Sequence, residues 1–478
     1  MGQMSKSQQD FADFTFICEK VLWYLQCKPK DLMNHFQQHK MDAFYFIQDK
    51  KRGMIFYGRE ASERFSNLAE RYLSSRKGEK AKTNLSEFIH EIKMEFARRF
   101  LENGEEVTER NMNRMIVAAY KKVAAKFELL THYIPCEIFF SKDIDTFSVG
   151  PIKFMHRRLF DQTYKDEIEQ LRVQIRKQHK ERCVKAISEG FPASRVASEE
   201  QSQELADSLV DGLISSFANY EWIALVPVPE CDVRVSYERA ISATKHALNI
   251  IKLLIGSQYT YLIRTSKDPG VVSKSAKLTR KSNGRLDISL NFGSNGNVVG
   301  ENWLEILNKN ASHYFTLAAI LLETWLSVDN PPPLCLRYID ALSWYGDAVS
   351  ERNSAAKIIK FVSAIERLTG TGKEKDRGVT EIVTNRASIL YSIATEESLT
   401  ESKAKIKVLY DCRSDLIHGS LSPFDRSCIS YGRKAGEISR MILLIGLDYF
   451  FSIGIDDLSI NQRRLKLKYK ELESKFSD

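Results

Sequence analysis

The sequence predicts an α+β protein that is predominantly helical, with a mixed α/β region over residues 1–330 and an all-α domain over residues 334–478. Three observations support this prediction. The chain has 478 residues, which is more than one ordinary hydrophobic core accommodates. Apolar spacing changes from a helical to a strand-like period inside the first region. The stretch "VDNPPPLC" (328–335) then contains three consecutive prolines, which favour an extended linker.

Residues 1–130 have mostly helical spacing. In "LSEFIHEIKMEFARRFLENGEE" (85–106) the apolar residues recur at helical intervals, and Gly104 ends the run. The stretch "NRMIVAAYKKVAAKFELL" (113–130) predicts a second such helix. The mixed region is therefore either continuous or divided into two subdomains near residue 130.

Strand-like alternation begins after residue 130. The stretches "HYIPCEIFF" (132–140) and "DTFSVGPIKFM" (145–155) predict short strands around a polar turn. The stretch "EWIALVPVP" (221–229) predicts a buried strand that ends at prolines. The stretch "GRLDISLNFGSNGNVV" (284–299) combines alternation with an Asn-Gly dipeptide, which is typical of a strand and turn. A second subdomain would accordingly cover residues 131–330.

The remaining apolar periods are helical. The charged stretch 157–187 predicts a long exposed helix, and residues 236–256 predict a helix that ends at Gly256. Beyond the prolines we expect helices at about 334–350, 354–370, 379–396, 400–418 and 425–452. A basic tail, "QRRLKLKYKELESKF", follows them.

Composition limits the classes of function. The chain is 43% hydrophobic and 28% charged, which is typical of a globular protein. A net charge of +8 permits a polyanionic partner such as RNA, but a solvated basic surface explains it equally well. Eight dispersed cysteines without zinc-like spacing predict reduced thiols in a cytoplasmic protein. We expect neither a metal nor another cofactor. The most apolar segment (441–455) is interrupted by Asp448 and is too short to cross a membrane.

One stretch, "VLYDCRSDLIHGS" (408–420), carries candidate chemistry. Arg413 and His418 are five residues apart, which on a helix separates them by about 140° of rotation. They would flank a surface, so that a phosphate lying across the helix end could touch both. Gly419 is a natural helix terminator, which places His418 near the last turn, where ligands reach it.

These two residue types suit metal-free cleavage of RNA. Histidine ordinarily titrates near neutrality, so His418 would take the proton of a ribose 2′-hydroxyl or give one to the leaving 5′-oxygen. The planar, permanently charged guanidinium of Arg413 would hold the phosphorane. The product would be a 2′,3′-cyclic phosphate, and DNA would resist because it lacks the 2′-hydroxyl. The alternative is a helix end at which two cations meet the C-terminal dipole.

The surroundings of this pair resemble a known family. "LYDCRSDLIHGS" is similar to the R-polar-x3-H signature of the HEPN superfamily, and more particularly of its Apea-like group, in which an Arg-Ser or Arg-Asn pair is followed after three residues by His-Gly-Ser. Arg413, Ser414 and His418 stand at the matching positions. The upstream stretch 341–370 resembles the opening helices of that group and carries an acid, Glu366, within an apolar run.

The resemblance covers about residues 335–452 and implies several properties. It implies an all-α HEPN helical bundle, a homodimer that brings two Arg/His motifs into one composite cleft, and a metal-independent endoribonuclease. Such proteins are often toxins or effectors of anti-phage defence. The N-terminal region would sense a phage-derived or other trigger, select an RNA such as tRNA or mRNA, or restrain the nuclease. The alternative is a non-catalytic HEPN module that dimerises or binds RNA, with the function carried by the N-terminal region.

Supporting roles are expected for two residues of this domain. Ser414 would orient Arg413 or donate to the phosphate, and its alternative is an ordinary exposed serine. Glu366 would fix the guanidinium of Arg413, and its alternative is an exposed acid on an amphipathic helix.

Basic residues downstream form two further candidates for RNA binding. Arg426, Arg433 and Arg440 recur every seven residues, close to two helical turns, and so form one stripe. The stripe is either a phosphate track that leads RNA to the cleft or a solvated face. The densest basic run, "RRLKLKYK" (463–470), either binds RNA or is a polar helix end without a ligand.

Overall fold

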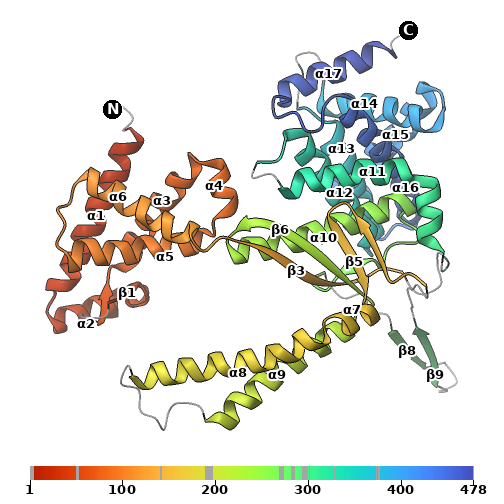
Figure 1. The fold of residues 1–478 in the computed structure, drawn as a ribbon. Coiled ribbons are helices and arrows are strands. Elements are labelled where there is room, and N and C mark those ends of the chain that lie inside the picture. The colour runs from red at the N-terminus through yellow and green to blue at the C-terminus, as the bar shows by residue number, and fades with distance from the viewer. Residues whose placement is uncertain are drawn as a thin grey trace. The chain divides into compact units, whose positions relative to one another are not determined.

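Helices dominate the structure, which is a computed structural model (Figure 1). In the part of the chain that it describes, one five-stranded sheet and two two-stranded hairpins accompany the helices. The expectation of an α+β, predominantly helical protein is confirmed. The structure describes residues 5–49, 53–139, 143–188, 198–268, 274–280, 286–292, 300, 302–327, 330–372, 374 and 377–476. Within these residues, none of the helices combines the length and the apolar character required to cross a bilayer.

The chain forms two compact units. The first comprises Met1–Leu130, Val228–Arg239 and Ser327–Asn330, and the second comprises Thr131–Pro227, Ala240–Leu326 and Pro331–Asp478. The helices after the triple proline therefore belong to the same unit as the sheet, instead of forming a unit that begins at residue 334. The reason is side-chain packing across the prolines: for example, Arg440 donates to the main-chain carbonyl of Leu253 at 2.7 Å.

Four helices of the first unit surround an aromatic core: α1 (Lys6–Gln26), α3 (Gly58–Ser74), α5 (Leu85–Phe96) and α6 (Glu109–Ala124). The shorter elements of the first unit are α2 (Pro29–Gln38), the 3-10 helix η1 (Lys40–Phe44), β1 (Phe46–Asp49), β2 (Gly53–Phe56), α4 (Lys77–Lys82) and the π-helix η2 (Ala97–Glu102). Phe14 and Phe96 meet edge to face with their ring centres 6.2 Å apart. The helix expected over 85–106 is confirmed as α5 and η2, and Gly104 adopts a left-handed conformation after them. The helix expected over 113–130 is confirmed only as far as Ala124, because residues 128–130 begin a strand.

The five-stranded sheet has the order β4-β5-β6-β3-β7. Its strands are β3 (Glu128–Glu137), β4 (Thr146–Val149), β5 (Ile152–His156), β6 (Trp222–Cys231) and β7 (Arg264–Thr265). Antiparallel pairing sets Phe154 of β5 opposite Ala224 of β6. The strands expected from the change of period are thus confirmed, but β6 runs through Pro227 and Pro229 to Cys231 instead of ending at the prolines. The indole of Trp222 donates to the carbonyl of Phe139 at 3.0 Å, which satisfies its one polar atom inside the core.

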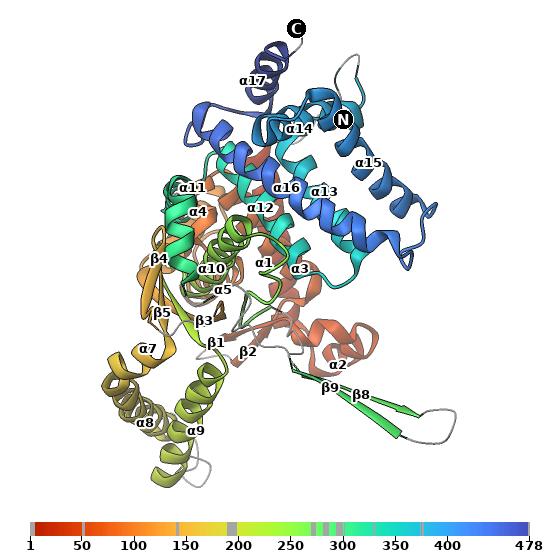
Figure 2. The same ribbon diagram turned by 90° about the vertical axis from the view of Figure 1, so that its right-hand side faces the viewer.

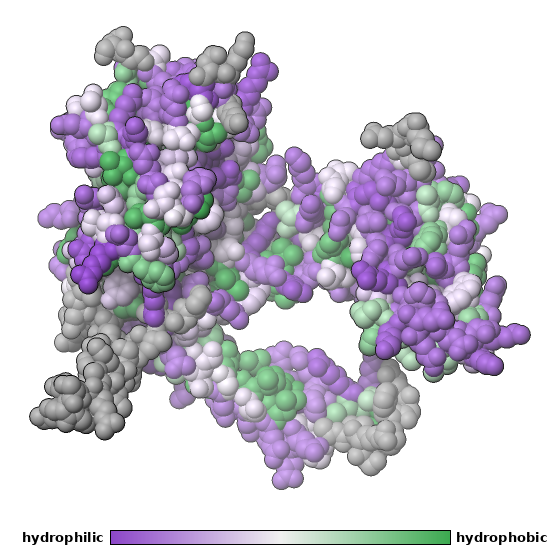
Figure 3. All heavy atoms as spheres, turned by 180° about the vertical axis from the view of Figure 1, so that it is seen from behind, coloured by the Kyte–Doolittle hydropathy of each residue, from purple (hydrophilic) through white to green (hydrophobic). Residues whose placement is uncertain are grey.

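Two hairpins extend the second unit. Helices α7 (Arg157–Thr163) and α8 (Lys165–Ser188) lead into α9 (Glu199–Ala218), and α8 is exposed as expected. Apolar side chains are visible among hydrophilic ones along this helical hairpin (Figure 3). Strands β8 (Lys274–Arg280) and β9 (Leu286–Phe292) pair antiparallel, which confirms the strand expected after residue 284. The Asn-Gly dipeptide of that prediction lies outside the described residues.

The C-terminal bundle consists of α12 (Pro333–Ser350), α13 (Ser354–Thr369), α14 (Val379–Thr395), α15 (Leu399–His418), α16 (Ser427–Ser452) and α17 (Gln462–Ser474). Helix α16 runs across α12 and α13 (Figure 2). Gly446 permits a close approach, because a Cβ there would lie 2.5 Å from Leu368. The five expected helices are confirmed to within two residues at each end. Two more helices lie mostly in the second unit: α10 (Val233–Ile255), from Ala240 onward, and α11 (Trp303–Ser327), up to Leu326. The sequence predicted α10 but not α11.

Candidate functional site

Helices α13 and α15 bring Glu366, Tyr410 and Arg413 together. The Nη2 of Arg413 donates to Glu366 Oε2 at 3.3 Å, and the hydroxyl of Tyr410 donates to the other carboxylate oxygen. Tyr410 and Arg413 are three residues apart on α15 and therefore share the face that packs on α13. The guanidinium also lies 5.8 Å from the centre of the Tyr410 ring. Glu366 thus contacts Arg413 and is not a solvated acid.

This arrangement orients Arg413 without using all of its donors. The side chains of Arg413 and Glu366 are 25% and 24% exposed. Their 3.3 Å hydrogen bond is longer than the roughly 2.7–2.9 Å of a strong charged pair. The Nε of Arg413 is buried and has no hydrogen-bond partner among the described residues. Its one hydrogen bond to Glu366 leaves the other Nη donors of the guanidinium for another anion.

Tyr410 acts as a donor in this cluster. Burial, and then the hydrogen bond to Glu366, raise the pKa of Tyr410 to about 12. Its hydroxyl therefore stays protonated at neutral pH and holds the carboxylate of Glu366 toward Arg413. Tyr410 was not among the predicted site residues, although its position three residues before Arg413 was an available signal.

His418 is exposed and is the last residue of α15. Gly419 follows with a φ of +81°, a left-handed conformation that ends the helix as expected. The amide of Leu421 donates to the carbonyl of Asp415 at 3.1 Å and closes the turn. The structure gives the His418 ring no hydrogen bond or ion pair within the described residues, so its nitrogens face solvent.

Arg413 and His418 lie on the same end of α15 but point differently. Five residues correspond to about 7.5 Å along a helix and about 140° around it. Arg413 is turned toward α13, whereas His418 is turned to solvent. Ser414, between them in sequence, is half-buried. A single copy of the chain therefore presents the arginine and the histidine as two neighbouring groups and not as a contacting pair.

The three arginines of the predicted stripe have different surroundings. Arg426 precedes the first turn of α16 and is exposed, and Arg433 is also exposed. The guanidinium of Arg440 instead donates to the carbonyls of Leu253 and Leu254 at 2.7 and 2.6 Å. Arg440 thus caps the end of α10 and is occupied, so a phosphate track along this helix would involve Arg426 and Arg433 alone.

Apolar side chains are exposed beside the motif. Ile417 is 47% exposed, Phe424 89% and Ile429 54%. They precede and follow His418 in the last turn of α15, the connecting turn and the first turn of α16. Exposed apolar residues that cluster near a charged site are typical of an interaction surface.

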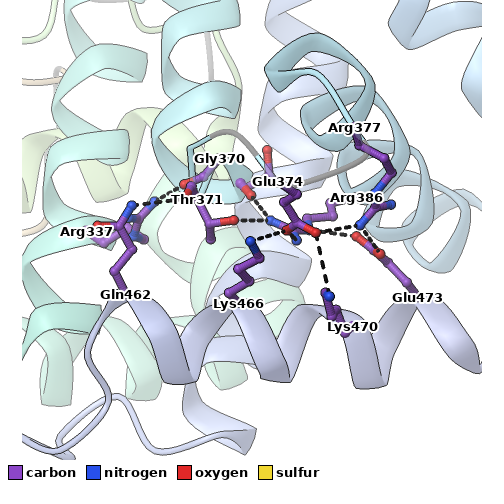
Figure 4. Close-up of polar contacts among 11 residues, drawn as sticks. Arg337, Gly370, Thr371, Glu374, Arg377, Arg386, Gln462, Lys466, Lys470 and Glu473 are labelled. Carbon is purple, nitrogen blue, oxygen red and sulfur yellow. Dashed lines mark hydrogen bonds and ion pairs between the residues drawn. The ribbon is translucent and has the colours of Figure 1, made fainter.

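The basic run 463–470 forms part of α17, which a buried charge cluster holds on the bundle (Figure 4). Arg386, which is fully buried, donates to Glu473 and Glu374 at 2.7 Å each and to Thr371 Oγ1 at 2.7 Å. Lys466 and Lys470 approach Glu374 at 3.7 and 3.9 Å. Both carboxylates are engaged by cations of the chain, so this cluster is a structural connection between α14 and α17.

A cavity of about 470 Å³ forms a second candidate site in the same unit. Lys252 of α10 lines it and is 4% exposed. Lys252 was not among the predicted site residues; the available signal was one lysine inside the apolar run "ALNIIKLLIG" (247–256). Within the described part of the chain, no three His, Cys, Asp or Glu residues are grouped as metal ligands would be.

Comparisons with known proteins give no family for this chain: no family model, curated protein or solved structure matches it.

Proposed function

We propose that the chain is a metal-independent endoribonuclease of the HEPN type that works as a homodimer. The observation that carries the proposal is the end of α15: Glu366 orients the partly exposed guanidinium of Arg413 through one hydrogen bond, and His418 is exposed on the same helix end. An oriented guanidinium with spare donors suits a phosphate, and an accessible imidazole suits proton transfer.

The proposed reaction uses only groups of the chain. Arg413 binds the non-bridging oxygens of a phosphodiester and stabilises the charge that grows on the phosphorane. His418 accepts the proton of the adjacent 2′-hydroxyl as its oxygen attacks phosphorus. The bond from phosphorus to the 5′-oxygen then breaks, and this oxygen takes a proton from the histidine of the second copy. The products are a 2′,3′-cyclic phosphate and a 5′-hydroxyl.

A second copy supplies what one copy lacks. One histidine cannot be base and acid in the same step, whereas two histidines related by a two-fold axis can divide these roles. The exposed apolar side chains of Ile417, Phe424 and Ile429 beside the motif support an interface at this place. Ser414, which is half-buried beside Arg413, would complete the contact with the phosphate.

We further propose a regulated role in a cytoplasmic setting, as a toxin or an effector of anti-phage defence. An unrestrained ribonuclease would damage its own cell, which is the reason to assign control to the N-terminal region. That region would respond to a phage-derived or other trigger, or select the RNA, with tRNA and mRNA as candidate substrates. Arg426 and Arg433 are exposed and available to phosphates on the way to the cleft.

The second candidate is a non-catalytic HEPN module that dimerises or binds RNA. The observation that favours it is the separate orientation of Arg413 and His418 within one copy. In this case the N-terminal region carries the function, and the apolar surface around Phe424 serves assembly alone.

The deciding experiment incubates full-length protein with total cellular RNA in excess EDTA. We expect the wild type to leave 2′,3′-cyclic phosphate ends, and Arg413→Ala and His418→Ala to be silent. His39→Ala, which removes another exposed histidine, is the matched control and should cleave like the wild type. Cleavage by His418→Ala at the wild-type rate would overturn the mechanism. Silence of all four proteins on every RNA would favour the non-catalytic module.

A further inference from the structure

The cavity around Lys252 has walls from both sides of the triple proline. Lys252 comes from α10, Tyr261 and Arg264 come from the segment that follows α10, and Ser350 ends α12. The cavity also reaches Lys360 of α13 and has a volume of about 470 Å³. This volume lies within the range of about 300–1,000 Å³ of small-molecule sites.

Lys252 is buried without a carboxylate. Its side-chain nitrogen donates to Ser350 Oγ at 2.9 Å, and no acid of the described residues lies within ion-pair distance of it. An ammonium offers three donors, so two remain after the serine. Burial lowers the pKa of Lys252 to about 8, because the loss of hydration disfavours the charged ammonium more than the nearby acids favour it. A buried cation of this kind calls for an anion from outside the chain.

The carboxylates that line the cavity are already engaged. Asp347 pairs with Lys245 at 2.8 Å, Glu351 pairs with Lys360 at 2.7 Å, and Asp268 accepts from the amide and the hydroxyl of Thr265.

The cations of the lining outnumber these acids, five to three. Arg264 and Arg352, like Lys252, have no acidic partner within ion-pair distance among the residues described. The cavity therefore carries a positive surplus that is not neutralised inside the protein.

An aromatic ring stands at the same cavity. Tyr261 is 45% exposed, and it also lines an adjoining cavity of about 460 Å³ that contains Lys357 and Arg433. A ligand with its anionic group at Lys252 would extend past this ring toward further cations. Aromatic faces of this kind stack on bases and sugars.

We propose that this cavity binds a small phosphate monoester, such as a nucleoside monophosphate, with the phosphate at Lys252 and the ring system beside Tyr261. A phosphate monoester carries about −1.5 to −2 charges and three acceptor oxygens, which match a surplus of cations with free donors. A passing RNA strand offers internal phosphates of only one charge each, which match this surplus of cations less well. The proposal does not depend on the ribonuclease activity.

The test is calorimetric titration of the full-length protein. The probes are inorganic pyrophosphate, adenosine 5′-monophosphate, adenosine without phosphate, and an RNA oligonucleotide without terminal phosphates. Lys252→Met removes the ammonium and keeps the length and burial of the side chain. Lys93→Met is the matched control, because Lys93 is a half-buried lysine outside the cavity whose pKa burial also lowers. Arg264→Gln is a second cavity variant at a half-exposed position, where folding is not at stake.

We expect the monophosphate to bind wild type and Lys93→Met equally, and Lys252→Met at least tenfold more weakly. Arg264→Gln should also weaken binding, and adenosine should not bind. If pyrophosphate also binds wild type, and Lys252→Met weakens its binding to the same extent, the cavity recognises the phosphate group without the ring system. The proposal is overturned if neither phosphate binds wild type, if Lys252→Met binds as well as Lys93→Met, or if the oligonucleotide binds through Lys252 while the monophosphate does not.

Discussion

Replacing Lys252 by methionine should stabilise the protein, and the gain should depend on pH in a defined way. The side chain is 4% exposed, and burial is the main cause that lowers its pKa from the ordinary value of 10.5 to about 8. Asp268 and Asp347 oppose this lowering, and Lys245 adds to it. At about 1.4 kcal/mol per pH unit, a lowering from 10.5 to about 8 corresponds to roughly 3 kcal/mol of destabilisation by the charged lysine.

The sign follows from proton binding. Between pH 8 and pH 10.5 the unfolded chain holds the Lys252 proton more tightly than the folded chain, so wild-type stability rises with pH in this window. The destabilisation is fully present below pH 8 and is lost above pH 10.5. Lys252→Met should therefore gain roughly 3 kcal/mol at pH 7, and the gain should vanish as the pH approaches 10.5.

The assay is thermal unfolding of wild type and variant, side by side, from pH 6.5 to pH 10.5. For a unit of roughly 330 residues, 3 kcal/mol corresponds to a midpoint shift of about 4–5 °C. Subtracting the unfolding midpoint of the wild type from that of the variant at each pH cancels the contributions of the other groups that titrate in this range. A destabilised variant, or a gain that does not change with pH, would refute the reasoning.

Three further predictions follow from contacts in the second unit. Arg386→Met should lower the free energy of unfolding by about 3–5 kcal/mol, measured in urea, because it leaves two nearly buried carboxylates short of a partner. Arg367→Met, which removes an exposed ion pair with Asp340, should lower it by less than about 1 kcal/mol. Equal losses of stability in the two variants would contradict this prediction. Glu366→Gln should lower the pKa of Tyr410 from about 12, because the hydrogen bond to the Glu366 carboxylate helps to raise it. Tyrosinate absorbance measures this change, and the same variant should slow RNA cleavage. An unchanged tyrosine titration would contradict the contact between Tyr410 and Glu366. Phe424→Asp should shift a dimer toward monomer in sedimentation, while Leu458→Asp at another exposed position should not.

The predictable parts of the fold depend on neighbours in sequence. Prolines before α12 and the terminator Gly419 are local signals, and together with the apolar period they placed the bundle helices to within two residues. The position of His418 at a helix end follows from the same signals. Helix α11 was not predicted from the sequence. It has a kink at Ala311, whose backbone angles are non-helical, so its apolar residues do not follow the spacing of one regular helix.

The sequence by itself determined the helices of the C-terminal bundle, most strands of the sheet and the position of Arg413 and His418 on one helix, because spacing and capping act over a few residues. The tertiary structure alone decided which distant groups meet: Glu366 with Arg413, and the carbonyls of Leu253 and Leu254 with Arg440. It also decided that the helices after the prolines share a unit with the sheet, and that Lys252 is buried. Burial and pairing depend on how helices far apart in the chain pack together, and this information is not contained in any local pattern.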